Sequence, residues 1–168
     1  MECFFCCDNV FIKLPAKRYL LIPYPGGFPL WNPYIFSGSP YFADLNIHAL
    51  YPGNVLYLIF DSPVALTVTV YAHILLSLLG MAYLIGLLGM SAPSAVIGGL
   101  VYGLSGTLIT YIDNVPLLYG ASLAPLSLAL IVRFLKKPSQ GAYLLSLLSL
   151  SVQAVSRHPQ ITVYSWLY

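Results

Sequence analysis

The sequence predicts an all-α membrane protein, a multi-pass transmembrane helical bundle with an outer loop that carries short interfacial helices. Two observations predict this class. Of the 168 residues, 59% are hydrophobic and only 7% are charged, whereas a soluble domain has about 25% charged residues. From residue 63 onward, apolar runs alternate with short polar turns, and a transmembrane helix needs about 20 apolar residues. We therefore expect the lipid bilayer to be the solvent for most of the chain.

The charge and the cysteines narrow the possible partners. A net charge of +2, with no extended basic stripe, excludes nucleic acid as the expected partner. Cys3, Cys6 and Cys7 lie at the start with no further ligand nearby, so they predict interfacial thiols, with S-acylation as the alternative, rather than a metal site. The first residues lack the basic start of a signal peptide.

Residues 1–62 are expected to form the outer loop. Several prolines and glycines interrupt residues 1–30, which indicates irregular chain. Asp44 to Leu50 is locally helical in pattern. A second short apolar helix is expected at 55–60, with Asn54 as its cap and with Tyr51 and Tyr57 at headgroup level.

Residues 63–168 are expected to hold about four spans and the start of a fifth. The first is Val64–Leu88, preceded by the cap residues Asp61 and Ser62 and by Pro63. His73 lies inside this run, and an imidazole in hydrocarbon is expected to face the interior of the bundle. It is either a hydrogen-bonded structural residue or a contact for a proton or a substrate.

The second span, about Pro93–Ile112, carries small residues at intervals of four. Such residues let a neighbouring helix approach closely. The two rows are Ala95, Gly99, Gly103 and Thr107, and Gly98, Tyr102 and Gly106.

The third span, about Pro116–Leu135, contains Pro125, which should kink the helix and free a carbonyl group. The fourth span is about Ala142–Ser156, and its serines can bond within the helix or to another helix. The final apolar run, Ile161–Tyr168, ends without a cap or a polar tail, so we expect the chain to be a fragment.

The basic turn after the third span predicts the orientation. Arg133, Lys136 and Lys137 are expected to be cytoplasmic. Alternation of the spans then brings the interesting polar groups to one outer face. These groups are Asp44, His48, Asp113, Arg157 and His158.

Such a face suits sugar chemistry. Aromatic rings stack on pyranose rings, a carboxylate deprotonates a hydroxyl or holds a divalent metal ion, and a guanidinium binds phosphate through two bonds. Each feature also has an ordinary structural explanation: the rings as a membrane belt, Asp44 and Asp113 as caps, and the Arg157–Gln160 segment as a turn.

Residues 31–52 read WNPYIFSGSPYFADLNIHALYP. This pattern, Trp-Asn-Pro-Tyr, then Gly-x-Pro, a small residue with Asp, and Tyr-Pro, resembles the first outer loop of the bacterial YfhO-like membrane proteins. They are related to the C-type glycosyltransferases, which use polyprenyl-phosphate sugars. The order continues with His73, with Ser105 and Gly106, and with residues 158–160, His-Pro-Gln, so the resemblance covers about residues 20–168.

The resemblance implies sugar transfer from a polyprenyl-phosphate carrier to a cell-envelope glycan or glycolipid, outside the bacterial cytoplasmic membrane. It also implies a first helix and many later helices beyond this chain. Asp44 is then the catalytic base, or the ligand of a divalent ion such as Mg²⁺ or Mn²⁺. The substrate-binding residues are Trp31, Asn32, Tyr34, His48, Asp113, Arg157, His158 and Gln160. The alternatives are a non-catalytic scaffold and a transport component that uses His73, Pro125 and the glycine rows.

Overall fold

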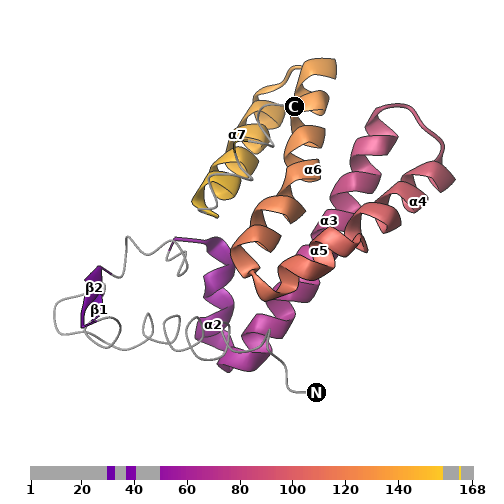
Figure 1. Cartoon of the computed structure of the whole chain (residues 1–168). Coiled ribbons are helices and arrows are strands. Elements are labelled where there is room, and N and C mark those ends of the chain that lie inside the picture. The colour runs from indigo at the N-terminus through magenta and orange to yellow at the C-terminus, as the bar shows by residue number, and fades with distance from the viewer. Residues whose placement is uncertain (1–29, 33–36, 41–49, 157–162, 164–168) are drawn as a thin grey trace. The chain divides into compact units, whose positions relative to one another are not determined.

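The computed structural model describes residues 30–32, 37–40, 50–156 and 163, and nearly all of the regular structure among them is helical (Figure 1). The helical part of the predicted fold class is therefore confirmed. The chain forms two compact units, Met1–Thr69 and Val70–Tyr168, and the boundary between them lies inside helix α3.

The first unit contains a strand pair and two short helical turns before α3. Strand β1 (Trp31–Asn32) pairs antiparallel with β2 (Ser39–Pro40). The 3-10 helix η2 (Pro52–Val55) continues directly into α2 (Leu56–Ile59). The strand pair lies in the predicted outer loop, where the sequence pattern indicated no strand.

Two predictions for the first unit are wrong. Asn54 does not cap the short helix, because helical structure already begins at Pro52, whose fixed φ suits a first turn. Tyr51 and Tyr57 do not form an exposed aromatic belt, because both side chains are buried within the protein. Tyr57 instead packs in a small cluster with Leu56, Ala65 and Leu66.

The second unit contains the rest of α3 and the helices that follow. These are α3 (Ser62–Leu87, shared with the first unit), α4 (Ala92–Gly103), α5 (Gly106–Thr110), the 3-10 helix η3 (Tyr111–Asp113), α6 (Val115–Lys136) and α7 (Gln140–Val155). Three stretches are long and apolar enough to cross a membrane: Pro63–Leu87, Ala92–Asp113 and Val115–Lys136. The positions of the first three predicted spans are thus close to those of the observed helices.

The second and fourth spans differ from prediction. The second is broken between α4 and α5, because Ser105 takes an extended conformation and its hydroxyl accepts a bond from the Leu108 N–H. Helix α7 has 16 described residues, about 24 Å at 1.5 Å per residue, and is shorter than a ~30 Å hydrocarbon layer. The predicted fifth span lies outside the described residues except for Val163.

Glycines let α4 lie close to α3, as the spacing predicted. A Cβ on Gly99 would come within 2.7 Å of the Leu78 carbonyl oxygen, and one on Gly103 would overlap the Leu78 side chain. A Cβ on Gly80 of α3 would likewise lie 3.1 Å from the backbone nitrogen of Leu126 in α6. The backbones of α3, α4 and α6 therefore approach one another through residues that have no side chain.

Helix α6 is the most enclosed of the long helices, with 61% of its apolar window buried against 22% for Ala92–Asp113. Pro125 has no N–H to bond the Ala121 carbonyl four residues earlier. The Tyr102 hydroxyl of α4 donates to that carbonyl oxygen at 2.9 Å. The freed carbonyl that Pro125 predicted is thus satisfied by another helix.

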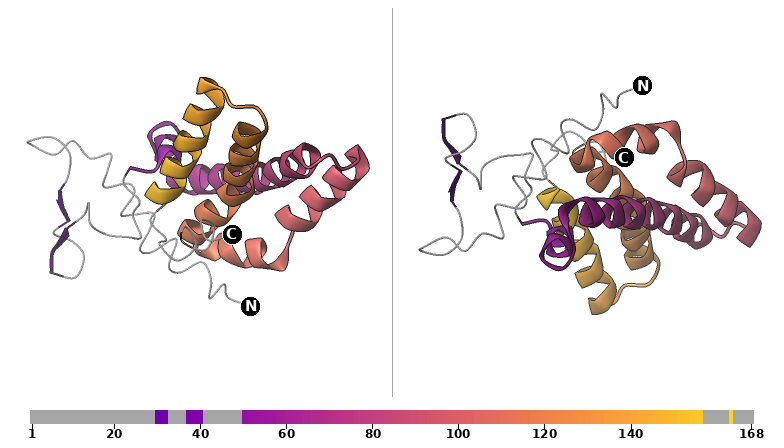
Figure 2. Two further views of the ribbon diagram at one scale, coloured as in Figure 1. Left: turned by 90° about the horizontal axis from the view of Figure 1, so that it is seen from above. Right: turned by 90° about the horizontal axis from the view of Figure 1, so that it is seen from below.

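Helices α6 and α7 form an antiparallel hairpin and lie side by side in both views of Figure 2. The Gln153 side chain of α7 donates from Nε2 to the Gly120 carbonyl at 3.2 Å. The buried face of α7 consists of small or polar residues, which are Ala142, Ser146, Ser149 and Gln153. Its serines bond within the helix, for example from Ser146 to the Ala142 carbonyl at 2.8 Å.

We expect Gly99→Ala to lower the free energy of unfolding by about 1–3 kcal/mol, because the new methyl meets a backbone oxygen that cannot move aside. Gly86→Ala is the matched control. It also adds a methyl to a helical glycine, but no heavy atom lies within 4 Å of the new Cβ, so stability should be unchanged or should rise by up to about 1 kcal/mol. Equal losses in detergent unfolding titrations would contradict the close packing of α3 and α4.

We expect Tyr102→Phe to cost about 1 kcal/mol, because the Ala121 carbonyl loses its donor. In a Pro125→Ala background the cost should be smaller, because residue 125 regains the N–H that bonds this carbonyl. A double-mutant cycle measures the difference, and Tyr71→Phe, which changes an exposed tyrosine, is the control. The same cost in both backgrounds would show that the hydroxyl does not replace the missing N–H.

Candidate functional site

The strand pair brings the two halves of the outer-loop motif together. Trp31 lies opposite Pro40, and Asn32 lies opposite Ser39. The Trp-Asn dipeptide and the Gly-Ser-Pro segment therefore belong to one local structure. Trp31, one of the predicted substrate-binding residues, is thus part of a strand pair.

Gly38 supports the Trp31 indole and has no room for a side chain. Its φ of +109° is in the left-handed region that favours glycine. A Cβ at this position would lie 2.7 Å from Cζ2 and 2.9 Å from Nε1 of Trp31. The ring thus lies directly on the Gly38 backbone.

The Trp31 side chain is nevertheless 53% exposed. Because the ring already rests on the Gly38 backbone, it loses little conformational entropy when a ligand covers its exposed part. This geometry suits stacking on an apolar sugar face, which is the role predicted for Trp31.

Most of the other predicted site residues lie outside the described residues. These are Asp44, Tyr34, His48, Arg157, His158 and Gln160. For Asn32 only the backbone is described, in β1. Their roles and their meeting on one outer face remain predictions, as does the assignment of Asp44 as a metal ligand. Within the described part of the chain, no group of three or more His, Cys, Asp or Glu side chains gathers to hold a metal ion.

Asp113 is the one predicted carboxylate of the site that is described. It ends η3, just before α6, and its side chain is partly buried. The next residue, Asn114, is the N-cap of α6. Its backbone carbonyl accepts a hydrogen bond from the Leu117 N–H at 2.8 Å, and its side chain makes no cap bond. The N-cap position of α6 is therefore occupied by Asn114 and not by Asp113, and the cap bond is made by the backbone of Asn114.

His73 faces the interior of the second unit, as predicted. Its side chain is buried, and its ring lies 4.6 Å from the Tyr119 ring of α6, centroid to centroid, at an interplanar angle of 33°. Tyr119 is fully buried. The contact joins α3 to α6, so His73 has at least a packing role.

Tyr57 is a buried phenol that sequence reasoning placed at a surface. Burial raises the pKa of Tyr57 from 10.0 to about 12, and the nearby Thr69 hydroxyl acts in the opposite direction. Burial also raises the pKa of Tyr51. The sequence signal for this burial is weak, since tyrosines next to a proline turn are equally common in exposed belts.

No family model, no curated protein and no solved structure matches this chain. The candidate site therefore rests on the chemistry of its residues and on the motif pattern.

We expect the first unit to lose stability as the pH rises from 10 toward 12. The unfolded phenol ionises near pH 10, whereas Tyr57 in the fold ionises only near pH 12, so the unfolded state binds fewer protons in this window and is favoured there. Below pH 10 this contribution is fully present. Tyr57→Phe should flatten the pH dependence of thermal unfolding in this window. An identical slope in wild type and Tyr57→Phe would contradict the assignment.

Proposed function

We propose that this chain is embedded in a membrane as a multi-pass helical bundle. The observation that carries the proposal is the reversed polarity of α7. Leu144 and Leu148 are 62% and 61% exposed, while the buried face carries Ser146, Ser149 and Gln153. In water the opposite face of this helix would be buried, since burying each leucine side chain stabilises the fold by about 1.5–3 kcal/mol. In hydrocarbon the exposed leucines cost nothing, and small polar residues suit the helix contact.

The hydrogen bonds of α7 fit the same environment. The hydroxyls of Ser149 and Ser151 donate to carbonyl oxygens of the same helix at 2.9 and 2.8 Å. Ser156 likewise donates to the Gln153 carbonyl at 2.6 Å. These hydroxyl donors need no water, which is the condition that a hydrocarbon solvent imposes.

For the activity, we propose transfer of a sugar from a polyprenyl-phosphate carrier to a cell-envelope glycan or glycolipid, on the outer face of the bacterial cytoplasmic membrane. The YfhO-like motif pattern and the open Trp31 ring on Gly38 support it. In this proposal Asp44 removes the proton of the acceptor hydroxyl or holds a divalent ion, Trp31 and Tyr34 stack on the sugar, and Arg157 and His158 bind the carrier phosphate.

The transport alternative is less well supported. It needs the glycine rows to line a path, but Gly98, Gly99 and Gly103 lie against side chains or backbone of α3. The carbonyl freed by Pro125 is bonded to Tyr102. The residues that would shape a path are thus used in helix contacts.

Membrane insertion is tested by expressing the chain and washing the membranes with alkaline carbonate, which removes peripheral proteins. We expect the chain to stay in the pellet. Replacing the exposed Leu144 and Leu148 with glutamine should reduce insertion, because two apolar side chains on the predicted lipid face become polar. Release of the wild-type chain by carbonate would overturn the membrane proposal.

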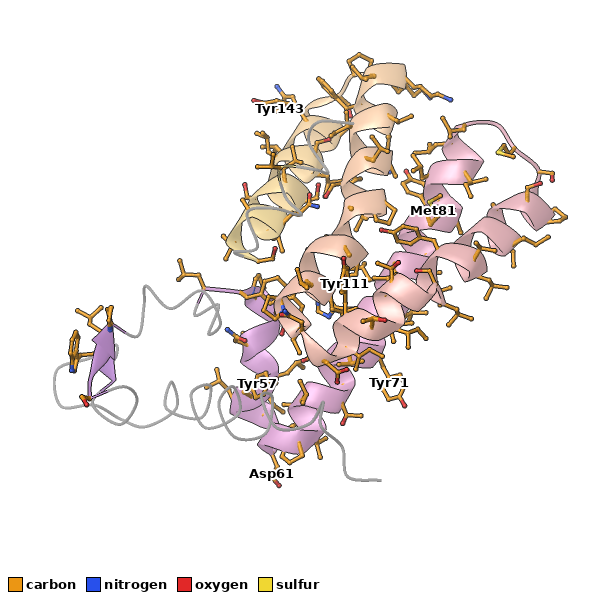
Figure 3. The ribbon with its side chains drawn as sticks, viewed as in Figure 1. Tyr57, Asp61, Tyr71, Met81, Tyr111 and Tyr143 are labelled. Atoms are coloured by element: carbon orange, nitrogen blue, oxygen red, sulfur yellow. The ribbon has the colours of Figure 1, made fainter. Side chains whose placement is uncertain are left out.

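Sugar transfer is tested in membranes that contain the protein, with polyprenyl-phosphate-linked radioactive sugars. We expect Asp44→Asn to lower kcat by about 10²–10⁴-fold, as for loss of a general base. Trp31→Ala should chiefly raise KM. Asp61→Asn is the matched control, since Asp61 is an exposed carboxylate at the start of α3 (Figure 3). Full activity of Asp44→Asn would remove Asp44 from the mechanism.

A further inference from the structure

The described cations of the chain gather at one end of α6. Arg133 and Lys136 lie in its last turn and Lys137 follows directly, and all three side chains are exposed. They are all of the lysines and arginines in the part of the chain that the structure describes. In the second unit the one described carboxylate, Asp113, lies before the opposite end of α6, so no described acid of that unit lies beside this group.

Two of the cations reach across to α3 and so form one surface with its carboxyl end. Arg133 Nη1 donates to the Tyr83 hydroxyl at 3.1 Å, and Lys136 Nζ donates to the Leu87 carbonyl oxygen. The turn from α3 to α4 and the turn from α6 to α7 lie at the same end of the second unit (Figure 1).

The Leu87 carbonyl is available because of how α3 ends. Gly89 has φ +87°, Gly89 N–H bonds Gly86 O at 3.1 Å, and Met90 N–H bonds Ile85 O at 3.4 Å. This is a Schellman end, which satisfies the carbonyls of the preceding turn but not the last ones. Lys136 is therefore held in place by a helix terminus rather than by an acid.

The cations have aromatic and apolar neighbours, of which Tyr83 is bonded to Arg133. Tyr83 is partly exposed, and Tyr143, near the start of α7 (Figure 3), is exposed and lies 5.8 Å from the Phe134 ring, centroid to centroid. Tyrosines concentrate at the level where hydrocarbon meets headgroups. Leu135, which precedes Lys136, and Leu88, which follows the Leu87 whose carbonyl Lys136 contacts, are also exposed.

We propose that Arg133, Lys136 and Lys137 bind the phosphate headgroup of anionic phospholipids in the leaflet they face. The inference rests on the proposed membrane insertion. A guanidinium has five N–H donors and an ammonium three, and the bonds to Tyr83 and Leu87 use one each. The remaining donors face a layer in which phosphate oxygens are the available acceptors.

The neighbouring apolar surface favours a lipid over a free phosphate ion. A phospholipid places its phosphate on the cations and its acyl chains along exposed side chains such as Leu135. A soluble anion would meet the same cations but leave that surface uncovered.

The test uses the full chain reconstituted in phosphatidylcholine vesicles, with spin-labelled phosphatidylglycerol or spin-labelled phosphatidylcholine as the probe. The fraction of each probe that is immobilised on the protein gives its relative association constant. We expect phosphatidylglycerol to be preferred, and Lys136→Gln with Lys137→Gln to reduce that preference roughly fivefold for each lysine removed. Inorganic phosphate should not displace the probe.

The matched control is Lys13→Gln with Lys17→Gln, which removes the same charge elsewhere in the sequence and should keep the preference. Lys137→Gln alone leaves the bond to Leu87 intact, so its roughly fivefold loss separates lipid binding from folding.

Equal losses in both double variants, or no preference in wild type, would overturn the inference. So would displacement of the probe by polyprenyl phosphate at far lower concentration, which would assign the surface to the carrier lipid. Failure of the chain to enter vesicles would instead count against the proposed membrane function.

Discussion

The hydrogen bond from Tyr102 to the Ala121 carbonyl answers a constraint that Pro125 imposes on the second unit. Pro125 removes a backbone donor from the middle of α6, the most enclosed long helix. In the hydrocarbon that we propose as solvent, no water replaces that donor, so the carbonyl needs a donor from elsewhere in the protein. Tyr102 supplies the bond at 2.9 Å and so fixes α4 against α6 at one height. The proline and the tyrosine are therefore best understood as a pair.

The other helix contacts follow the same constraint in different ways. Between α3 and α4, Gly99 lets backbones approach until van der Waals contact itself holds the helices. Between α6 and α7, the small and polar residues of α7 allow the close approach, and the Gln153 side chain donates a hydrogen bond to the Gly120 carbonyl. On α7 the apolar side chains Leu144 and Leu148 are exposed. This reversed arrangement of α7 suits apolar surroundings, so it supports the proposed membrane location in addition to composition.

The proposed chemistry and the proposed lipid contact draw on different kinds of residue. The sugar platform depends on a local structure in the first unit, in which Gly38 holds the Trp31 ring while leaving it open. The lipid surface depends on cations fixed by helix ends in the second unit, through Lys136 and the Leu87 carbonyl. Neither depends on a buried charge. Each can therefore be altered by substitution with little expected loss of folding stability, which makes the two proposals separable by experiment.

The sequence by itself determined the number of long apolar helices up to α6, their approximate ends, the close approach at Gly99 and the carbonyl freed by Pro125. These follow from local rules: bilayer thickness sets helix length, and a missing Cβ or N–H has the same effect wherever it occurs. The pattern WNP…GSP also marked the region in which Trp31 and Gly38 meet. Only the tertiary structure decided that Tyr102 and Gln153, 19 and 33 residues from their acceptors, supply the bonds, and that Tyr57 is buried rather than interfacial. Each of these depends on which distant side chain arrives at a given place, and that is a property of packing which no local pattern contains.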